Sequence, residues 1–504
     1  MRITKITLTN AAPPSQQEPS WTFCPKCKGR GRVRLKVRKK VKLSYQAALL
    51  EFEQQGGTGT APDRPKVHLS LCPRCLGSGL QAAANPPTAD VENYPKVAII
   101  GGGIGGVALA VACLHRGIPF TLYERDSDFS ARSQGYGLTL QQASKAIEGL
   151  GVVSLDKGVV STRHVVHSTD GKILGEWGMR KWLDCDENKA PKRTNIHIAR
   201  QSLRFALLEQ LNAPLQLHEA ITWGHQLVDL KESVNLQGTA AGVELSFEVD
   251  GEIKTAKADL VGGADGVRSA VRHLALGEDS SSLRYLDCIA ILGICPLSAL
   301  TDVDPDINSD LLDSATVFQT ANGHERIYIM PFDADSVMWQ LSFPIPENEA
   351  KALSAQGAEA LKAEACKRAQ WHSPIPQILA ATPSALVSGY PVYDRALLSA
   401  AALAKLGAVT LLGDAAHPMS PCKGQGANQA LLDALSLART LVRGCHLQPS
   451  WREVGLRSSV LNEFEAEMLK RSAVKVQESA DAAEFLHSEV VLHESNEPRG
   501  RCLK

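Results

Sequence analysis

Residues 96–126, KVAIIGGGIGGVALAVACLHRGIPFTLYERD, decide the fold. Four apolar residues at 97–100 predict a short buried strand, and a helix is predicted from about 105 to 115. A second strand follows and ends at Glu124, where a carboxylate can accept hydrogen bonds from ribose hydroxyls. A strand, a glycine-rich turn, a helix and a second strand in this order are typical of an α/β domain that binds a dinucleotide.

The glycines of the turn fit the pattern GxGxxG, and each has a physical task. Gly101 permits the tight turn, Gly103 lets a pyrophosphate approach the backbone, and Gly106 lets the helix pack closely on the strand. The positive end of the helix faces the phosphates. Ile104 in the turn and Arg125 after the second strand complete the cofactor-binding residues predicted in this stretch.

Two later stretches distinguish FAD from NAD, which the turn alone does not do. They are ADLVGGADGVRSAVR at 258–272 and AVTLLGDAAHPMSPCKGQGANQALLDALSLA at 408–438. Together with the glycine turn they resemble the group A flavoprotein monooxygenases, typified by para-hydroxybenzoate hydroxylase. The tetracycline-inactivating flavin monooxygenases are a closer likeness. The resemblance covers about residues 96–485.

The resemblance implies further residues at the flavin. In that family the motif matched by Gly413 and Asp414 binds the ribityl chain of FAD, and an arginine at a helix start near the flavin is matched by Arg200. Asp265 belongs to a motif associated with both FAD and the nicotinamide cofactor. The residues that would lie against the isoalloxazine ring are Pro418, Gly424, Gly426, Ala427 and Asn428.

The same resemblance implies the reaction. NAD(P)H, a transient co-substrate, reduces the flavin, O2 forms a flavin C4a-hydroperoxide, and one oxygen atom hydroxylates an organic substrate that is expected to be aromatic or polycyclic. Halogenation or double-bond reduction on the same fold is an alternative. Flavin halogenases usually carry a WxWxIP signature, and MWQLSFPIP at 338–346 has only Trp339. A different alternative is a binding or regulatory protein that carries a flavin scaffold.

Residues 315–345 predict an inserted substrate domain, because they read as three strands joined by turns at 321–324 and 333–335. Met330, Pro331 and Phe332 are candidates to line the substrate pocket. The predicted fold class is α/β, with a Rossmann-type FAD-binding domain, an inserted antiparallel sheet and a zinc-clamped β-hairpin module. The predicted divisions are 1–20 (disordered), 21–80 (zinc module), 81–95 (linker), 96–270 and 391–450 (FAD-binding domain), 153–195 and 271–390 (substrate domain) and 451–504 (helical region and tail).

Two CPxCxGxG repeats in the N-terminal unit predict a metal site. The ligands would be Cys24, Cys27, Cys72 and Cys75, because four thiolates suit tetrahedral zinc and a CxxC turn directs two sulfurs at one ion. A redox dithiol is the alternative. The unit resembles half of the cysteine-rich domain of DnaJ-type chaperones, with two repeats in place of four.

Basic residues concentrate in the same unit. Residues 1–95 carry 15 Lys and Arg against 6 Asp and Glu, whereas the remainder carries 39 against 48. Basic and mostly apolar residues alternate from Arg32 to Leu43, which predicts a strand with one basic face, followed by a short helix near 45–55. That face is either a platform for an acidic partner (protein, nucleic acid or membrane surface) or a solvated surface.

The remaining composition bounds the setting of the protein. No stretch approaches a membrane-spanning helix, and the N-terminus lacks the apolar core of a signal peptide. The other eight cysteines have no regular spacing, which favours a reducing compartment over a disulfide scaffold. The expected location is the cytoplasm, with a short organelle-targeting signal left open.

Overall fold

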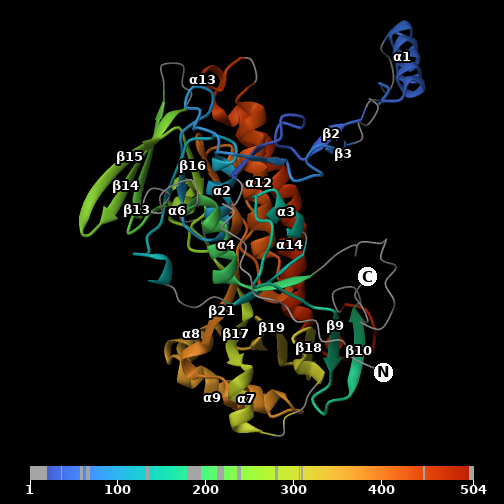
Figure 1. The fold of residues 1–504 in the computed structure, drawn as a ribbon, viewed down its shortest axis with the longest axis vertical. Helices are drawn as coiled ribbons and strands as arrows, with labels where there is room; N and C mark the ends of the chain where they lie inside the picture. Colours follow the sequence, from blue (N-terminus) through green and yellow to red (C-terminus); the bar gives the residue numbers. More distant parts are fainter. Residues whose placement is uncertain are drawn as a thin grey trace.

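The computed structural model describes residues 20–35, 37–56, 61–63, 69–131, 136–141, 143–178, 195–212, 221–234, 240–277, 282–305, 307, 310–446 and 449–498. Figure 1 shows two bodies stacked along the long axis, with an N-terminal unit beside the upper one. No helix in these ranges is both long enough and apolar enough to cross a membrane.

The upper body contains a five-stranded sheet in the order β12-β6-β5-β16-β22. All neighbouring strands in it run parallel. Such a sheet needs cover on both faces, and the central strands here are fully buried. The strands are β5 (Val97–Ile100), β6 (Phe120–Tyr123), β12 (Ile221–Thr222), β16 (Leu260–Gly263) and β22 (Val409–Leu411).

Helix α2 (Ile104–Leu114) lies at the centre of the upper body, packed between other helices. It follows the glycine turn, and every residue in it is buried. It packs against α12 (Gly426–Gly444) and α4 (Arg200–Asn212), and α14 (Asn462–Phe485) packs on α12. The shorter helices of this body are α3 (Ser144–Glu148), α6 (Ala270–Leu276), α11 (Ala400–Leu403) and α13 (Trp451–Val454).

The lower body contains a seven-stranded sheet in the order β10-β9-β18-β19-β20-β17-β21, antiparallel except between β9 and β18. It includes the predicted three-stranded meander, which is therefore confirmed as β18 to β20. The strands are β9 (Arg163–His167), β10 (Ile173–Gly178), β17 (Arg284–Pro296), β18 (Thr316–Ala321), β19 (Arg326–Pro331), β20 (Ser336–Pro344) and β21 (Val387–Asp394).

One face of this sheet packs on four helices and the other faces the upper body. Side chains alternate across a strand, so Ile327, Trp339 and Leu341 join the apolar core formed with the helices. The helices are α7 (Leu297–Val303), α8 (Glu347–Ala355), α9 (Ala358–Arg368) and α10 (Ile375–Ala381). The predicted α/β fold with an inserted antiparallel sheet is confirmed.

Two small sheets complete the upper body. One has the order β7-β11-β8 and lies near the cavity described below, whereas the other is the antiparallel ribbon β13-β14-β15 that projects in Figure 1. The strands are β7 (Gly137–Leu140), β8 (Val159–Val160), β11 (Ile196–Ala199), β13 (Gln226–Val234), β14 (Ala240–Val249) and β15 (Glu252–Ala258).

The N-terminal unit consists of two strand pairs and one helix. Strand β1 (Ser20–Phe23) pairs with β4 (Leu80–Ala83), and β2 (Arg32–Arg34) pairs with β3 (Leu69–Leu71). Both pairs are antiparallel, as the hairpin prediction requires. Helix α1 (Lys39–Gln54) has no buried residue and extends away from the molecule (Figure 1).

The long basic strand predicted from Arg32 to Leu43 is wrong. Strand β2 ends at Arg34, and α1 begins at Lys39, so three of the basic residues lie on the first turn of a helix. Within the described residues, β2 pairs with the three residues of β3, Leu69–Leu71. Lys, Leu, Ala, Gln and Glu fill the segment that follows β2, and all favour a helix.

Residues 84–95 lie along the upper body. The indole of Trp451 donates to the carbonyl oxygen of Asn93, and the guanidinium of Arg452 donates to the carbonyl oxygens of Val91 and Glu92. The hydroxyl of Tyr94 contacts His446 Nε2 at 2.9 Å. These contacts attach the segment between the cysteine unit and β5 to helix α13 and the end of α12.

Candidate functional site

A cavity of about 1550 Å³ lies between the glycine turn, the start of α12 and the free face of the seven-stranded sheet. Pockets for one small ligand usually measure about 300–1,000 Å³, so this space suits a large cofactor and a substrate together. The predicted cofactor residues that line it are Gly103, Ile104, Arg125, Arg200, Asp265, Gly413, Asp414, Pro418, Gly424, Gly426 and Ala427.

The glycine turn has the geometry of a phosphate cradle. A Cβ on Gly106 would lie 1.8 Å from the carbonyl oxygen of Gly101, so helix α2 approaches β5 only because this residue is glycine. Gly101 has a φ of +105°, which glycine tolerates best. Gly103 differs, because its φ of −73° suits any residue and its Cβ would meet only a terminal nitrogen of Arg200, at 3.9 Å.

Gly103 therefore supplies the fit test for a dinucleotide. Neither backbone conformation nor protein contacts require glycine there, and the residue caps α2 while lining the cavity. Empty space at a helix N-terminus, kept free of any side chain, fits a phosphate that approaches the backbone amides. The residues present fit FAD at this place.

Glu124 directly follows β6 and lies beside the turn without lining the cavity. Its carboxylate accepts hydrogen bonds from the amides of Gly102, at 2.5 Å, and Asp126, at 3.1 Å. An ionised carboxylate has about four acceptor positions, so two remain for ligand hydroxyls. Arg204 supports the turn from α4, since its Nε donates to the Gly102 carbonyl oxygen at 2.7 Å.

Arg200 opens α4 and faces the cavity. Its guanidinium donates to the hydroxyl of Tyr136 at 3.1 Å and lies over the ring of that residue. The nearby Tyr136 and Asp414 raise the pKa of Arg200 against the opposing effect of burial. Burial raises the pKa of the Asp414 carboxyl, and Arg200 opposes that rise. The two predicted residues are thus brought together, with opposite charges facing the same space.

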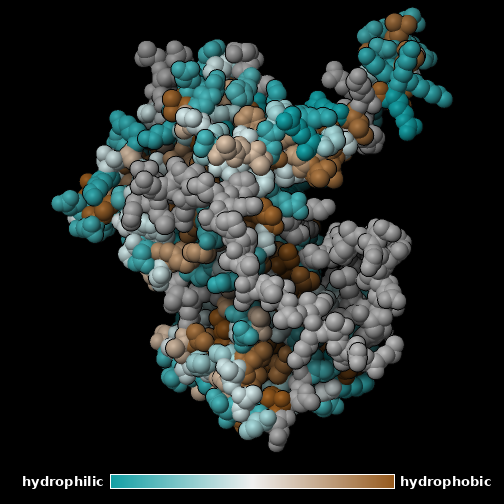
Figure 2. All heavy atoms as spheres, in the orientation of Figure 1, coloured by the Kyte–Doolittle hydropathy of each residue, from teal (hydrophilic) through white to brown (hydrophobic). Residues whose placement is uncertain are grey.

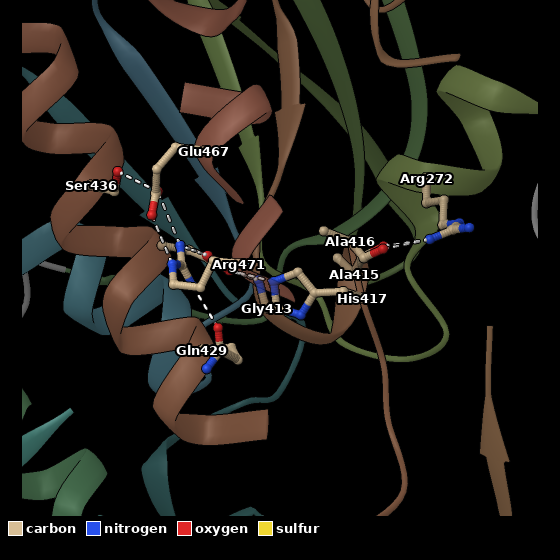
Figure 3. A network of polar contacts seen from close by, with 10 residues as sticks. Arg272, Gly413, Ala415, Ala416, His417, Gln429, Ser436, Glu467 and Arg471 are labelled. Carbon is tan, nitrogen blue, oxygen red and sulfur yellow. Dashed lines mark hydrogen bonds and ion pairs between the residues drawn. The ribbon is translucent and has the colours of Figure 1, made fainter. Parts of the chain in front are cut away.

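A buried polar network holds the Gly413–Asp414 turn in place (Figure 3). Asp433 of α12 accepts hydrogen bonds from the amide of Gly413 at 2.8 Å and from His417 Nε2 at 2.7 Å. Arg471 of α14 donates to the other Asp433 oxygen at 2.8 Å and to Gln429. Burial alone would lower the pKa of His417, but the Asp433 carboxylate raises it above its ordinary value.

Asn428 lies beneath the cavity and does not line it. Its Nδ2 donates to the carbonyl oxygens of Thr139 and Gly424, and its Oδ1 accepts from the amides of Gln141 and Ala143. The side chain, fully buried, fastens the loop before α12 to strand β7. Gly424 within that loop has a φ of +59°. These hydrogen bonds give Asn428 a positioning role, and its contact with the ring stays a prediction.

Asp265 reaches the cavity from the end of β16. One carboxylate oxygen accepts the amide of Val271 at 3.0 Å, whereas the other, Oδ1, is buried and has no partner among the described residues. Burial raises the pKa of this carboxyl. Nearby, Arg272 Nη1 donates to the carbonyl oxygens of Ala415 and Ala416 (Figure 3), which ties α6 to the Asp414 turn.

The free face of the seven-stranded sheet supplies residues that the sequence analysis missed. Met330 lines the cavity, whereas Pro331 and Phe332 are not among its lining residues. The period-two alternation of β18, β19 and β20 could have identified the others, because the residues opposite the helix-packed face all point one way. On these three strands the polar ones are Gln319, Arg326, Tyr328 and Gln340, and strands β9 and β21 add His164 and Tyr390.

The four predicted metal ligands converge in the N-terminal unit, far in the chain from the cavity residues. Their ligand atoms all lie within 4.8 Å of one another. Cys24 Sγ and Cys72 Sγ are 3.9 Å apart, and Cys27 Sγ and Cys75 Sγ are 3.7 Å apart. A tetrahedral ion with metal–sulfur bonds of about 2.3 Å places its sulfurs about 3.8 Å apart. The set therefore fits zinc.

Comparisons with known proteins agree with the site. A family model described as FAD binding domain matches residues 94–446. The aurachin C monooxygenase/isomerase of Stigmatella aurantiaca is 28% identical over 354 residues, which cover 68% of this chain and 80% of that protein.

Two solved structures share the fold at lower identity. The 2,6-dihydroxypyridine-3-hydroxylase from Arthrobacter nicotinovorans has a TM-score of 0.61 at 19% identity, covering 83% of this chain and 96% of that one. The tetracycline destructase Tet(51) has a TM-score of 0.52 at 19% identity, covering 78% and 92%. The chain belongs to the family that carries this FAD binding domain, and within it to the FAD-dependent monooxygenases.

Proposed function

We propose that this monooxygenase takes electrons from NAD(P)H and transfers one oxygen atom of O2 to a planar, aromatic or polycyclic substrate that carries an anionic group. The observation that carries the substrate class is the buried guanidinium of Arg326 on the free face of the sheet, which has no carboxylate partner among the described residues. The redox and oxygen chemistry is supplied by FAD when it is bound.

The flavin side of the cavity provides binding and orientation. Gly103 leaves room for a phosphate at the positive end of α2, and Glu124 offers acceptors to ribose hydroxyls. Asp414 and Gly413 are proposed to hold the ribityl chain. Helix α12 begins at Gly426 in the cavity wall, so its N-terminal amides favour negative charge on the ring.

NAD(P)H is proposed to enter the same cavity. The sequence has no second glycine turn of the GxGxxG type, so a separate nicotinamide domain is not expected. The loop of Asp265, Gly266 and Arg268 lines the cavity beside the flavin residues and offers both an acceptor and a cation.

Arg326 marks the substrate side. The residue is 5% exposed, its Nε donates to Gln319 Oε1 at 2.8 Å, and its guanidinium lies over the ring of Tyr328. No carboxylate pairs with it among the described residues, and burial lowers its pKa. A buried cation without an anionic partner is costly, so a carboxylate, phenolate or enolate on the substrate is the complement that this site favours.

The substrate class is tested by two variants of Arg326. Arg326→Met should raise KM for an aromatic carboxylate about 10- to 150-fold, the loss of a charged hydrogen bond, with little change for the matching neutral amide. Arg326→Lys should recover part of the loss. Arg368→Met is the control, because Arg368 pairs with Glu325 and Glu364 and does not line the cavity.

The anionic substrate class is tested by measuring the rate of NAD(P)H oxidation with a panel of planar aromatic acids and their amides. Equal stimulation by acids and amides in the wild type, or an unchanged acid preference in Arg326→Met, would refute the anionic class. Retained FAD affinity in the variant shows that the cofactor site is intact.

We also propose that the four cysteines hold a structural zinc ion in a reducing compartment such as the cytoplasm. The sulfur separations support the metal over a redox dithiol. The acidic partner predicted for the basic residues would now meet α1, where exposed hydrophilic side chains predominate (Figure 2).

A further inference from the structure

The two cysteine turns are joined by one arginine of helix α12. Arg439 Nε donates to the carbonyl oxygen of Gly29 at 3.0 Å, and its Nη2 donates to the carbonyl oxygen of Ser78 at 3.1 Å. Gly29 follows the first cysteine pair and Ser78 follows the second. The guanidinium therefore lies between the two turns and contacts both.

The turns themselves are reciprocal. The amide of Cys24 donates to the Gly79 carbonyl oxygen, and the amide of Cys72 donates to the Gly31 carbonyl oxygen. A Cβ on Gly31 or on Gly79 would come within 2.3 Å of a backbone oxygen of the opposite turn and within 3.4 Å of Arg439. The arginine is thus packed directly against the paired turns.

A second arginine lies beside the same turns. Arg116, just after the end of α2, is 1% exposed, and a Cβ on Gly29 would lie 3.5 Å from its Nε. Its Nη1 donates to the Ala112 carbonyl oxygen, whereas Nε and Nη2 have no partner among the described residues. Burial, and then repulsion from Arg439, lowers the pKa of Arg116 to about 9.

Among the described residues, no carboxylate balances these two cations. The groups that favour the charged form of Arg116 are Cys113, Cys27 and Tyr94, and those that favour the charged form of Arg439 are Cys27 and Cys75. Four neutral thiols, or two disulfides, would leave the buried Arg116 and the half-buried Arg439 without a negative charge beside them, which is unfavourable. Four thiolates around a divalent cation carry about two net negative charges.

We propose that Arg116 and Arg439 are the counter-charges of a divalent metal held by four thiolates, and that this pairing makes the metal site part of the FAD-binding domain. The proposal rests on the zinc site proposed above. The charges are opposite in sign, Arg439 belongs to helix α12, and Arg116 lies just after the end of α2. The N-terminal unit then acts as a metal-dependent support for that domain.

Two helices connect the cysteine turns to the flavin site. Helix α2 begins at the glycine turn and leads to Arg116, and α12 begins in the cavity wall and carries Arg439. The two helices also pack against each other. Loss of the metal would leave two uncompensated cations against the far parts of the helices that form the cofactor cradle, so the FAD domain should lose stability.

The test combines removal of the metal with replacement of the two arginines in the full-length protein, so that the effect of each can be compared with and without the other. Metal content, thermal unfolding and flavin release are measured with and without chelator under reducing conditions, for wild type and for Arg116→Met/Arg439→Met. Chelation should lower the wild-type melting temperature by on the order of 5 °C or more and release flavin at a lower temperature. In the double variant this shift should shrink to less than half. Arg443→Met, on the same helix but paired with Glu463, should behave as wild type.

The outcomes separate the pairing from the metal site itself. A purified protein with no bound metal would refute the zinc site. One metal per chain whose removal leaves flavin release unchanged, or lowers the melting temperature equally in wild type and double variant, would refute the pairing alone. If the double variant does not fold, Arg439→Lys replaces it in the test, because lysine keeps the positive charge and loses the two hydrogen bonds of the guanidinium. This variant should bind the metal and retain most of the chelator-induced shift in melting temperature.

Discussion

Replacing Gly103 by serine tests why glycine occupies the start of α2. Serine is a favoured N-cap residue, so helix α2 should lose nothing by the change. The backbone angles of Gly103 suit serine, and a Cβ there would meet no protein atom closer than 3.9 Å. The apo protein should therefore unfold at an unchanged temperature.

The affinity for FAD should fall in this variant. The added side chain projects into the space proposed for the pyrophosphate, and overpacking of a filled site costs about 1–3 kcal/mol. At 1.4 kcal/mol for each factor of ten, the Kd for FAD should rise about 5- to 150-fold. The matched variant is Gly106→Ser, whose Cβ would lie 1.8 Å from a backbone oxygen and which should destabilise apo and holo protein alike.

The assay is a titration of apo protein with FAD, followed by flavin fluorescence, together with thermal unfolding of both variants. An unchanged Kd in Gly103→Ser would show that no phosphate approaches this amide. Equal loss of apo stability in the two variants would show that Gly103 has a purely structural role.

Three further predictions concern the network around the cavity. Asn428→Ala should lower the free energy of unfolding by about 2 kcal/mol or more, measured in urea, because it leaves buried amides and carbonyls unpaired. Asp433→Asn should weaken FAD binding more than it lowers apo stability at pH 7, measured by titration, if the Gly413 turn depends on the carboxylate; the reverse order would contradict this. The raised pKa of His417 predicts stability that is complete below about pH 6.5, the unfolded value, and is lost as the pH rises through the folded value. A melting-temperature profile should show this loss in wild type and not in His417→Gln.

Local patterns predicted the parts of the fold that local physics determines. The glycine turn was identified because close packing of α2 on β5 imposes glycine at fixed spacing, as the 1.8 Å clash at Gly106 illustrates. The meander was identified because turn residues separate three apolar runs. The structure after Arg34 was mispredicted, because the alternation of basic and apolar residues up to Leu43 is typical of a strand. In the structure, helix α1 already begins at Lys39.

Pairings between distant residues lay beyond the sequence analysis. The lack of a carboxylate partner for Arg326 among the described residues depends on which face of β19 points to the cavity and on which side chains lie near it in space. The contact of Arg439 with Gly29 joins residues 410 positions apart. Burial and charge balance decide such roles, and both require the folded chain.

The central claim is tested most directly with isotopically labelled oxygen. Purified protein loaded with FAD is supplied with NAD(P)H and ¹⁸O2 and with the planar aromatic acid that most stimulates NAD(P)H oxidation. We predict one labelled oxygen atom in the product for each NAD(P)H consumed. Sustained NAD(P)H oxidation that yields only hydrogen peroxide across the panel, with no label in any product, would contradict the assignment.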